Sequence, residues 1–287
     1  MREKIHGYLV VSSYEDNSKF QTIYQTLISA FNQEGIVLDC KTALDLGLGS
    51  KINKPDVDFI LFWDKDVYLA KKLVNSGIRL FNNAQAIEEC DNKILTYLRL
   101  DKANIPMPRT YIPPKTFVGV PYPNLTFLDK LPLSYPYIIK EAFGSYGKQV
   151  YLINNRKEAE KLIKSLGYKD FLIQEYIEEA KGLDIRVNVV GNKVVNAIER
   201  INEHDFRSNL SNGGHGKEYK VSKEIEDLAI KACKALGLDF AGVDVIISNN
   251  GPLICEINSN PHFLSTLEIT GHNLALDIAK YIKEQLC

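Results

Sequence analysis

Short apolar runs alternate with amphipathic stretches through the first 90 residues of the chain. The apolar runs predict strands at residues 8–11, 36–38, 57–63 and 78–81. Between them, apolar residues spaced three and four apart predict helices over 19–33 and 68–75. Strands that alternate with helices predict a small open parallel sheet. Ser12 and Ser13 follow the first strand in place of glycines, so we do not expect a dinucleotide site there.

Strands paired as hairpins dominate the pattern in the rest of the chain. One or two helices are expected over 84–100, and a proline-rich segment from 105 to 136 then wraps a surface. The pattern predicts further helices over 156–166, 222–236 and 272–286, and strands over 137–141, 149–153, 171–176, 183–190, 193–200, 242–248 and 252–258. We therefore expect an α/β unit followed by an α+β unit.

The composition is that of an ordinary folded protein. The 287 residues are 45% hydrophobic and 25% charged, which is enough chain for two or three packed units. A net charge of -1 without blocks of like charge argues against nucleic acid and anionic membranes as partners. We find no apolar run that approaches the roughly 20 residues of a membrane span, and no signal peptide. Five scattered cysteines without metal-ligand spacing favour the cytoplasm.

Three oxygen-bearing side chains gather on the last predicted hairpin, which residues 249–251 close. Strand alternation puts Glu256 and Asn258 on one face, where Asp244 of the facing strand can meet them. Carboxylate and amide oxygens suit Mg²⁺ and leave room for water and phosphate oxygens. Solvated acids on a half-exposed hairpin are the alternative interpretation.

A lysine and a glycine-bearing loop form a second candidate site. Lys140 ends one strand, and Gly144–Gly147 leads into the next. The loop offers backbone N–H groups to a polyphosphate and the lysine offers a point charge, although a plain turn is the alternative. The chain has no Walker A signature at this place.

Three other segments are candidates for ligand contacts. Glu175 and Tyr176 end an apolar strand whose edge can receive an adenine, or can be structural only. Asp184 and Arg186 share one face of a strand, where they either contact a ligand or pair with each other. The polar, glycine-rich segment 205–216 fits a loop that closes over a ligand, or a solvated loop.

In this order, the motifs resemble those of ATP-grasp ligases of the RimK type. The resemblance rests on residues 174–177, 182–186, 197–200, 205–210, 241–245 and 251–258. It is strong over about the last two thirds of the chain and looser over the first 90 residues. It implies a pre-ATP-grasp α/β domain at 1–90 and an ATP-grasp domain at 91–287. Within the latter it implies an ATP-binding flap subdomain at about 100–175 and a metal-binding subdomain at 176–287.

The resemblance also implies the cofactors ATP and Mg²⁺, or Mn²⁺ in its place, and roles for individual residues. Lys140 and Arg207 are the expected catalytic residues, which stabilise the transferring phosphoryl group. The expected nucleotide contacts are Lys93, Lys140, the flap residues Gly144, Ser145, Tyr146 and Gly147, the adenine edge Glu175 and Tyr176, Asp184 at the ribose, and Arg207, Ser208 and Asn209. The expected Mg²⁺ ligands are Asp244, Glu256 and Asn258.

The implied activity joins a carboxylate to an amine through an acyl phosphate. The implied partners are an amino acid such as glutamate and a carboxylate-bearing small molecule, peptide C-terminus or carrier protein, with self-association common among relatives. The candidate substrate contacts are Arg186, Arg200, Asn260 and His262, although either arginine could instead pair with Glu199 or Asp184. ATP binding without turnover, and a kinase that stops at a phosphorylated product, are the alternative functions.

Two departures from the family pattern are visible. Gln149 stands where the RimK namesake has a further glycine, which related amino-acid ligases tolerate. Residues 259–263 include His262 and Phe263 where small residues and a glycine are more usual. This turn borders the acceptor site in the family, so the departure concerns the substrate and not the reaction.

Overall fold

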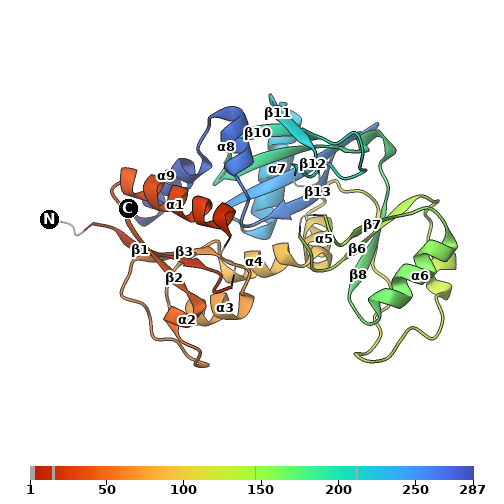
Figure 1. Ribbon diagram of the computed structural model, residues 1–287, viewed down its shortest axis with the longest axis horizontal. Helices are drawn as coiled ribbons and strands as arrows, with labels where there is room; N and C mark the ends of the chain where they lie inside the picture. Colours follow the sequence, from red (N-terminus) through yellow and green to blue (C-terminus); the bar gives the residue numbers. More distant parts are fainter. Residues whose placement is uncertain (1–3, 15–16, 146, 211–212) are drawn as a thin grey trace.

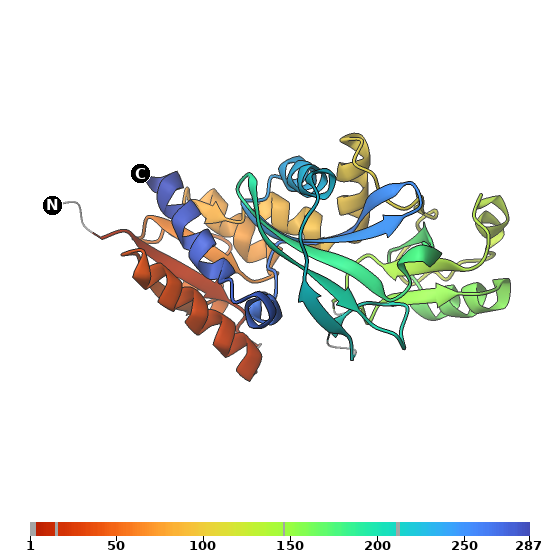
Figure 2. The ribbon, with the colours of Figure 1, turned by 90° about the horizontal axis from the view of Figure 1, so that it is seen from above.

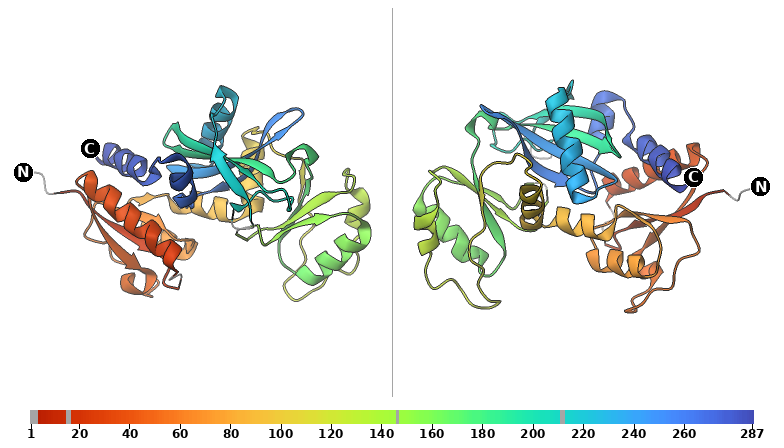
Figure 3. Two further views of the ribbon diagram at one scale, coloured as in Figure 1. Left: turned by 45° about the horizontal axis from the view of Figure 1, so that its top comes forward. Right: turned by 180° about the vertical axis from the view of Figure 1, so that it is seen from behind.

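Three sheets follow one another along the long axis of the protein (Figures 1 and 2). The computed structural model describes residues 4–14, 17–145, 147–210 and 213–287. The sheet built from the last part of the chain lies between the other two, which places it beside both (Figure 3). Among the described residues, no helix is long and apolar enough to cross a membrane.

The first sheet is parallel, as the sequence predicts, with strand order β2-β1-β3-β4. Its elements are β1 (His6–Val11), α1 (Ser18–Gln33), β2 (Val37–Thr42), α2 (Ala43–Leu46), β3 (Phe59–Trp63), α3 (Val67–Asn75) and β4 (Leu80–Phe81). Every residue of β3 is buried, because α1 packs on one face of the sheet and α3 on the other. Parallel strands bring the ends of β1 and β3 to the same edge.

The predicted helical segment after this sheet is divided in two by Asn92. The side chain of Asn92 accepts hydrogen bonds from the backbone N–H groups of Ile94 and Leu95, and so caps a new helix. The two helices are α4 (Ala84–Asp91) and α5 (Lys93–Lys102). The division places Lys93 at the start of α5.

The second sheet is antiparallel, with strand order β5-β8-β6-β7. Its elements are β5 (Thr110–Tyr111), η1 (Thr126–Lys130), β6 (Tyr137–Glu141), β7 (Val150–Ile153), α6 (Arg156–Leu166) and β8 (Phe171–Glu175). Tyr137 and Ile139 face α6 in an apolar core. Strand alternation therefore turns Lys140 to the opposite face, toward the third sheet.

The third sheet is also antiparallel, with strand order β11-β10-β9-β12-β13. Its elements are η2 (Glu178–Ala180), β9 (Leu183–Val190), β10 (Lys193–Ile201), β11 (His215–Glu218), α7 (Lys223–Leu236), β12 (Phe240–Ser248) and β13 (Gly251–Asn258), followed by α8 (Leu264–Thr270) and α9 (Leu274–Leu286). Helix α7 covers the apolar face of this sheet. The polar face is turned toward the neighbouring units.

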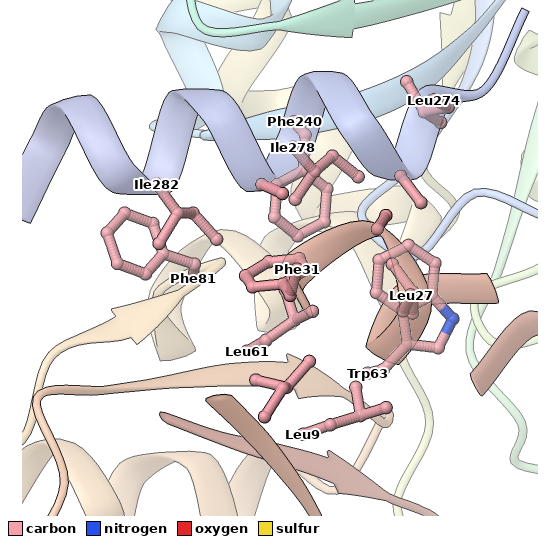
Figure 4. Close-up of a cluster of buried hydrophobic side chains, with 14 of the residues drawn as sticks. Leu9, Leu27, Phe31, Leu61, Trp63, Phe81, Phe240, Leu274, Ile278 and Ile282 are labelled. Atoms are coloured by element: carbon pink, nitrogen blue, oxygen red, sulfur yellow. The ribbon is translucent and has the colours of Figure 1, made fainter. Parts of the chain in front are cut away.

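The C-terminal helix returns to the first sheet. Ile278 and Ile282 of α9 pack over Phe31 and Phe81 in one apolar cluster (Figure 4). The buried amide of Asn82 donates hydrogen bonds to the carbonyl oxygens of Phe240 (2.9 Å) and Ser259 (2.8 Å). The core of the first sheet therefore includes residues from both ends of the chain, and the first and third sheets are joined by buried contacts.

Candidate functional site

Two cavities meet on the polar face of the third sheet. An inner cavity of about 120 Å³ lies between the second and third sheets. An outer cavity of about 340 Å³ lies between the first and third sheets. Arg200, Asn209 and Glu256 line both cavities and so mark their junction.

The inner cavity collects most of the residues that the sequence predicts as nucleotide contacts. They lie on α5, β6, β9, the end of β8, the loop 205–209 and the last residue of the flap. The predicted residues on its wall are Lys93, Lys140, Gly147, Glu175, Tyr176, Asp184, Arg207, Ser208 and Asn209. Ser145 lines the outer cavity instead, and the predicted contact Tyr146 lies outside the described residues.

The flap and the loop 205–209 contact each other across the mouth of the inner cavity. Arg207 donates a hydrogen bond from Nη1 to the carbonyl oxygen of Gly147 at 2.6 Å. Gly147 has φ of +69°, and a Cβ atom there would lie 2.7 Å from the side-chain oxygen of Asn209. Both the conformation and the space therefore require glycine. Because ligand pockets usually hold at least about 300 Å³, the flap and this loop would have to move apart to admit a nucleotide to the inner cavity of about 120 Å³.

Lys140 is a buried cation beside the inner cavity. Its side chain is 7% exposed, and its ammonium lies 3.7 Å from the Cys255 sulfur. Among the described residues, it forms no ion pair with an acidic side chain. Burial raises the pKa of the Cys255 thiol, so this sulfur does not supply the missing negative charge. Buried charges are normally paired, so the position favours an anionic ligand.

Lys93 joins three parts of the site. Its ammonium lies 3.0 Å from Glu256 Oε1 and donates to the carbonyl oxygen of Gly144 at 3.1 Å. Lys93 thereby links α5, the predicted metal strand and the flap. A phosphate at this place would compete with Glu256 for the ammonium.

The predicted adenine edge is only partly available to a ligand. The carboxylate of Glu175 accepts hydrogen bonds from Arg109 Nε at 3.0 Å and Nη2 at 2.8 Å. Hydrogen bonding to Arg109 lowers the pKa of this carboxyl. Tyr176 and Ile177 line the cavity. A base at this edge would therefore contact these side chains and the strand backbone, and not the Glu175 carboxylate.

A buried cluster of two acids and two arginines lies beneath the junction of the cavities. Arg200 donates from Nε to Asp184 at 2.7 Å, and its Nη2 lies 3.0 Å from Asp244 Oδ1. Arg186 donates from Nη2 to Asp244 Oδ2 at 2.9 Å, with a second bond from Nε to Oδ1. Burial would raise the pKa of Asp244, but the two arginines lower it. The alternative of a structural pair between Arg200 and Asp184 is thus observed, whereas Arg186 pairs with Asp244 and not with Asp184.

A β-bulge sets the direction of Glu256. Asp244 pairs with Glu256, but the next pair in the ladder joins Val245 to Ile254, so Cys255 is an extra residue. The bulge lets Ile254 face the apolar core while Glu256 shares a face with Asp244. Asn258 lies two residues further on and lines the outer cavity.

The oxygen donors of Asp244, Glu256 and Asn258 fit a hard divalent cation. Among the described residues, no group of three or more His, Cys, Asp or Glu side chains is arranged as a metal site. Asp244 already accepts bonds from both arginines. A cation would therefore share this carboxylate with Arg186 and Arg200.

The N-terminal wall of the outer cavity was not predicted from the sequence. This wall consists of Ser12, Lys19, Phe20, Tyr24, Trp63, Asp64 and Lys65. Its members come from α1 and from the ends of β1 and β3. Ligands of open α/β sheets bind at the carboxyl ends of the strands, so the predicted sheet already contained the signal that could have found them.

The turn after β13 carries the predicted substrate residues Asn260 and His262. Asn260 donates from Nδ2 to the carbonyl oxygen of Asp64 at 2.9 Å, so its amide nitrogen holds the first sheet. The ring of His262 meets Phe20 edge to face, with ring centroids 4.9 Å apart. Burial, and then Lys19, Arg186 and Lys65, lower the pKa of His262 to about 4. His262 is therefore neutral at pH 7.

A family model described as RimK-like ATP-grasp domain matches residues 90–282. The chain belongs to the RimK-like ATP-grasp family. Family membership confirms the resemblance identified from the motifs, and with it an ATP-dependent ligase family.

Relatives of this RimK-like chain cover most of its length. An uncharacterized protein of Mycoplasma genitalium is 30% identical over 93% of the chain and 99% of its own length. A probable alpha-L-glutamate ligase of Vibrio vulnificus is 36% identical, over 72% of the chain and 68% of its own length. Beta-citrylglutamate synthase B of Danio rerio is 32% identical, over 76% of the chain and 54% of its own length.

Solved structures confirm the ATP-grasp fold. A RimK domain protein of Sphaerobacter thermophilus superposes with a TM-score of 0.72 at 18% identity, over 97% of this chain and 99% of the other. D-alanine–D-alanine ligase of Bacillus anthracis, in complex with ATP, superposes with a TM-score of 0.73 at 16% identity, over 99% of this chain and 97% of the other. The expected parallel sheet ahead of an ATP-grasp fold is therefore confirmed.

The stability of this RimK-like protein should fall between pH 6.5 and 4 because of His262. The ring stays neutral in the folded state, where its pKa is about 4, whereas the unfolded chain takes up a proton below about pH 6.5. The unfolded state therefore binds more protons across this window, and acid destabilises the fold by up to about 3 kcal/mol.

Urea unfolding of the wild type and of His262→Gln at several pH values would measure this effect. The difference between the two proteins should shift in favour of the variant as the pH falls from 7 to 4. If the difference in the free energy of unfolding between the two proteins does not change with pH, His262 is not the cause of the acid destabilisation.

Proposed function

We propose that this RimK-like protein forms an amide bond between a carboxylate and an amine, with ATP in the inner cavity and the two substrates in the outer one. The main support is Lys140, a cation that is 7% exposed and faces a closable cavity. The γ-phosphate of ATP is an anion that this position can receive.

The inner cavity offers contacts for each part of the nucleotide. Lys93 and Lys140 would hold phosphate oxygens, and Arg207 would turn from Gly147 toward the γ-phosphate. Tyr176 and Ile177 would pack on the base. Asp184 accepts a hydrogen bond from Arg200, so a ribose hydroxyl would have to share this carboxylate with the arginine.

Asp244, Glu256 and Asn258 would hold Mg²⁺, or Mn²⁺, at the junction of the cavities. A cation held by these residues would supply positive charge beside the phosphate groups of the nucleotide. The position of Glu256 on the walls of both cavities supports this placement.

The chemistry needs no nucleophilic side chain. A carboxylate oxygen of the first substrate attacks the γ-phosphorus, and ADP leaves. The amine of the second substrate then attacks the acyl carbon, phosphate leaves, and the nitrogen loses a proton. Lys140 and Arg207 would stabilise the phosphoryl group in both steps. The flap and the loop 205–209, lying over the bound nucleotide, would keep water from the acyl phosphate.

We further propose that an amino acid is one substrate. The names of the Vibrio vulnificus and Danio rerio relatives make glutamate the first candidate and citrate one candidate acceptor. Arg186, Arg200, Asn260 and His262 border the cavity where these molecules would meet. A peptide C-terminus or a carrier protein is an equally suitable acceptor for a cavity open to solvent.

The test is ADP release from MgATP across pairs drawn from pooled amino acids and pooled carboxylates, with L-glutamate and citrate included. We expect ADP only with particular pairs, together with an amide product of matching mass. Product formation without an amine would indicate a kinase. Tight ATP binding without ADP from any pool or from cell extract would indicate a binding protein, and either result would overturn the proposal.

A further inference from the structure

We propose that the N-terminal wall of the outer cavity selects a substrate with a carboxylate away from its reacting end, and that Lys65 and Lys19 bind this carboxylate. The inference rests on the proposed function, because it names the substrate class of the same site. It assigns a binding role to the first sheet, where the family motifs are absent.

The position of Lys65 carries the first part of the argument. Lys65 follows β3 at the carboxyl edge of the first sheet and lines the outer cavity. Its ammonium lies 2.7 Å from Asp91 Oδ1 and donates to the flap residue Ser145 at 3.2 Å. Asn260 binds the carbonyl oxygen of Asp64, so the segment that bears Lys65 is held against the third sheet. The cation is thus placed between substrate cavity and flap.

The two arginines of the cavity are held by buried acids, whereas the partner of Lys65 is the part-buried Asp91. Arg186 and Arg200 are bound to Asp184 and Asp244 in a closed group of two cations and two anions. A substrate carboxylate could bind these arginines only by displacing a buried aspartate, which is unfavourable. The side chain of Lys65 is 51% exposed, so exchanging Asp91 for a substrate carboxylate requires far less desolvation.

Three cations gather beside the His262 ring, in a cavity that the acids Asp64 and Glu256 also line. The charged groups that act on the ring of His262 are Lys19, Arg186 and Lys65, and each lowers its pKa. These three cations come from α1, from β9 and from the segment after β3, and they converge on one point of the cavity. The His262 ring adds no charge of its own at pH 7. A substrate carboxylate placed between Lys19 and Lys65 would be attracted by both ammonium groups.

The rings beside the lysines indicate the rest of the ligand. Phe20 and Trp63 lie on this wall, and His262, from the turn after β13, lines the same cavity and contacts the Phe20 ring. This surface suits a short aliphatic stem that ends in a carboxylate. The reacting group at the other end of the stem would reach Glu256 and Asn258. An acidic amino acid has this shape and charge.

Calorimetric binding to the full-length protein tests the inference with two matched pairs of probes. L-glutamate and L-aspartate are each compared with the amide of the same size, L-glutamine and L-asparagine. We expect at least one acid to bind about tenfold or more tightly than its amide. Lys65→Met and Lys19→Met should each weaken the binding of that acid about tenfold and leave the affinity for its amide unchanged. Lys65→Arg keeps the positive charge and should keep the affinity for the acid.

Lys71→Met is the matched control. Lys71 is 47% exposed and has a single acidic partner, Glu88, but it does not line the outer cavity. The inference is overturned if neither acid binds better than its amide, if acid and amide weaken equally, or if Lys71→Met has the same effect. O-phospho-L-serine bound more tightly than both acids would also overturn it, because the wall would then select phosphate.

The ADP assay separates this inference from the proposed function. Selective binding of an acid through Lys65 without ADP from any substrate pair would keep the inference about the wall and reject the ligase. ADP and amide formation that ignores substrate charge, with unchanged KM values in the lysine variants, would keep the ligase and reject the inference. A rise in the KM for ATP in Lys65→Met would assign this lysine to the nucleotide and reject the inference as well.

Discussion

Replacement of Glu256 by glutamine is expected to lower amide formation by about 100- to 1000-fold. Glu256 lines both cavities and lies 3.0 Å from Lys93. The variant keeps the shape of the side chain but removes the negative charge that would bind a divalent cation. The carboxylate is partly exposed, so the fold should remain intact. The rate of ADP release should fall, and a higher Mg²⁺ concentration should be needed for half of the maximal rate. Initial rates of ADP release over a range of Mg²⁺ concentrations measure both.

Glu218→Gln is the control for this experiment, because Glu218 is an exposed acid on β11 that lines neither cavity. Its rates should match those of the wild type, and urea unfolding should show that both variants are folded. Rates of Glu256→Gln within about threefold of the wild type would contradict a metal at the junction, since a lost ligand should have a much larger effect.

Replacement of Arg200 by methionine is expected to lower the free energy of unfolding by about 3 to 5 kcal/mol at pH 7. Arg200 is 6% exposed and lies between Asp184 and Asp244. Burial would lower the pKa of Arg200, but the two aspartates raise it, so the arginine is charged in the folded state. Without it, the buried carboxyl of Asp184, whose pKa burial already raises, loses its cation partner. Urea unfolding of the two proteins at pH 7 gives the difference.

The double variant Arg200→Met/Asp184→Asn separates the loss of charge from the loss of packing. The neutral amide introduced by Asp184→Asn would not need a cation, and Arg186 still pairs with Asp244. We therefore expect the double variant to be more stable than Arg200→Met. Equal stability of the single and double variants would show that the charge of Asp184 is not the cause. A loss below about 1 kcal/mol in Arg200→Met would contradict the buried cluster itself, because such values are typical of exposed pairs.

Local patterns were enough to predict most of the elements and the last hairpin. The spacing of Asp244 and Glu256 indicated that they could meet, and the register of β12 and β13 places them opposite each other. The short elements α2, β5, α8 and β11 were not predicted, because two to seven residues carry too little periodicity. The single bulged residue Cys255 has no signal of its own in an apolar strand.

Charge partners could not be predicted in the same way. Asp184 and Arg186 are close in sequence and share a face, which suggested that they pair. In the structure, Arg186 lies opposite Asp244 and Asp184 lies opposite Arg200, because β9 is flanked by β12 and β10. Cross-strand neighbours lie closer together than residues two apart on the same strand. The order of strands in the sheet therefore decides the pairing.

The sequence by itself determined the types of the elements, the family and the residues expected to bind ATP in such a family, because periodicity and short motifs are local properties of the chain. The tertiary structure alone decided that the third sheet lies between the other two, that α9 packs on the first sheet, and that Lys19 and Lys65 face the same cavity as Glu256. These features depend on which apolar surfaces bury one another across long separations in the sequence. Spacing along the chain does not contain that information.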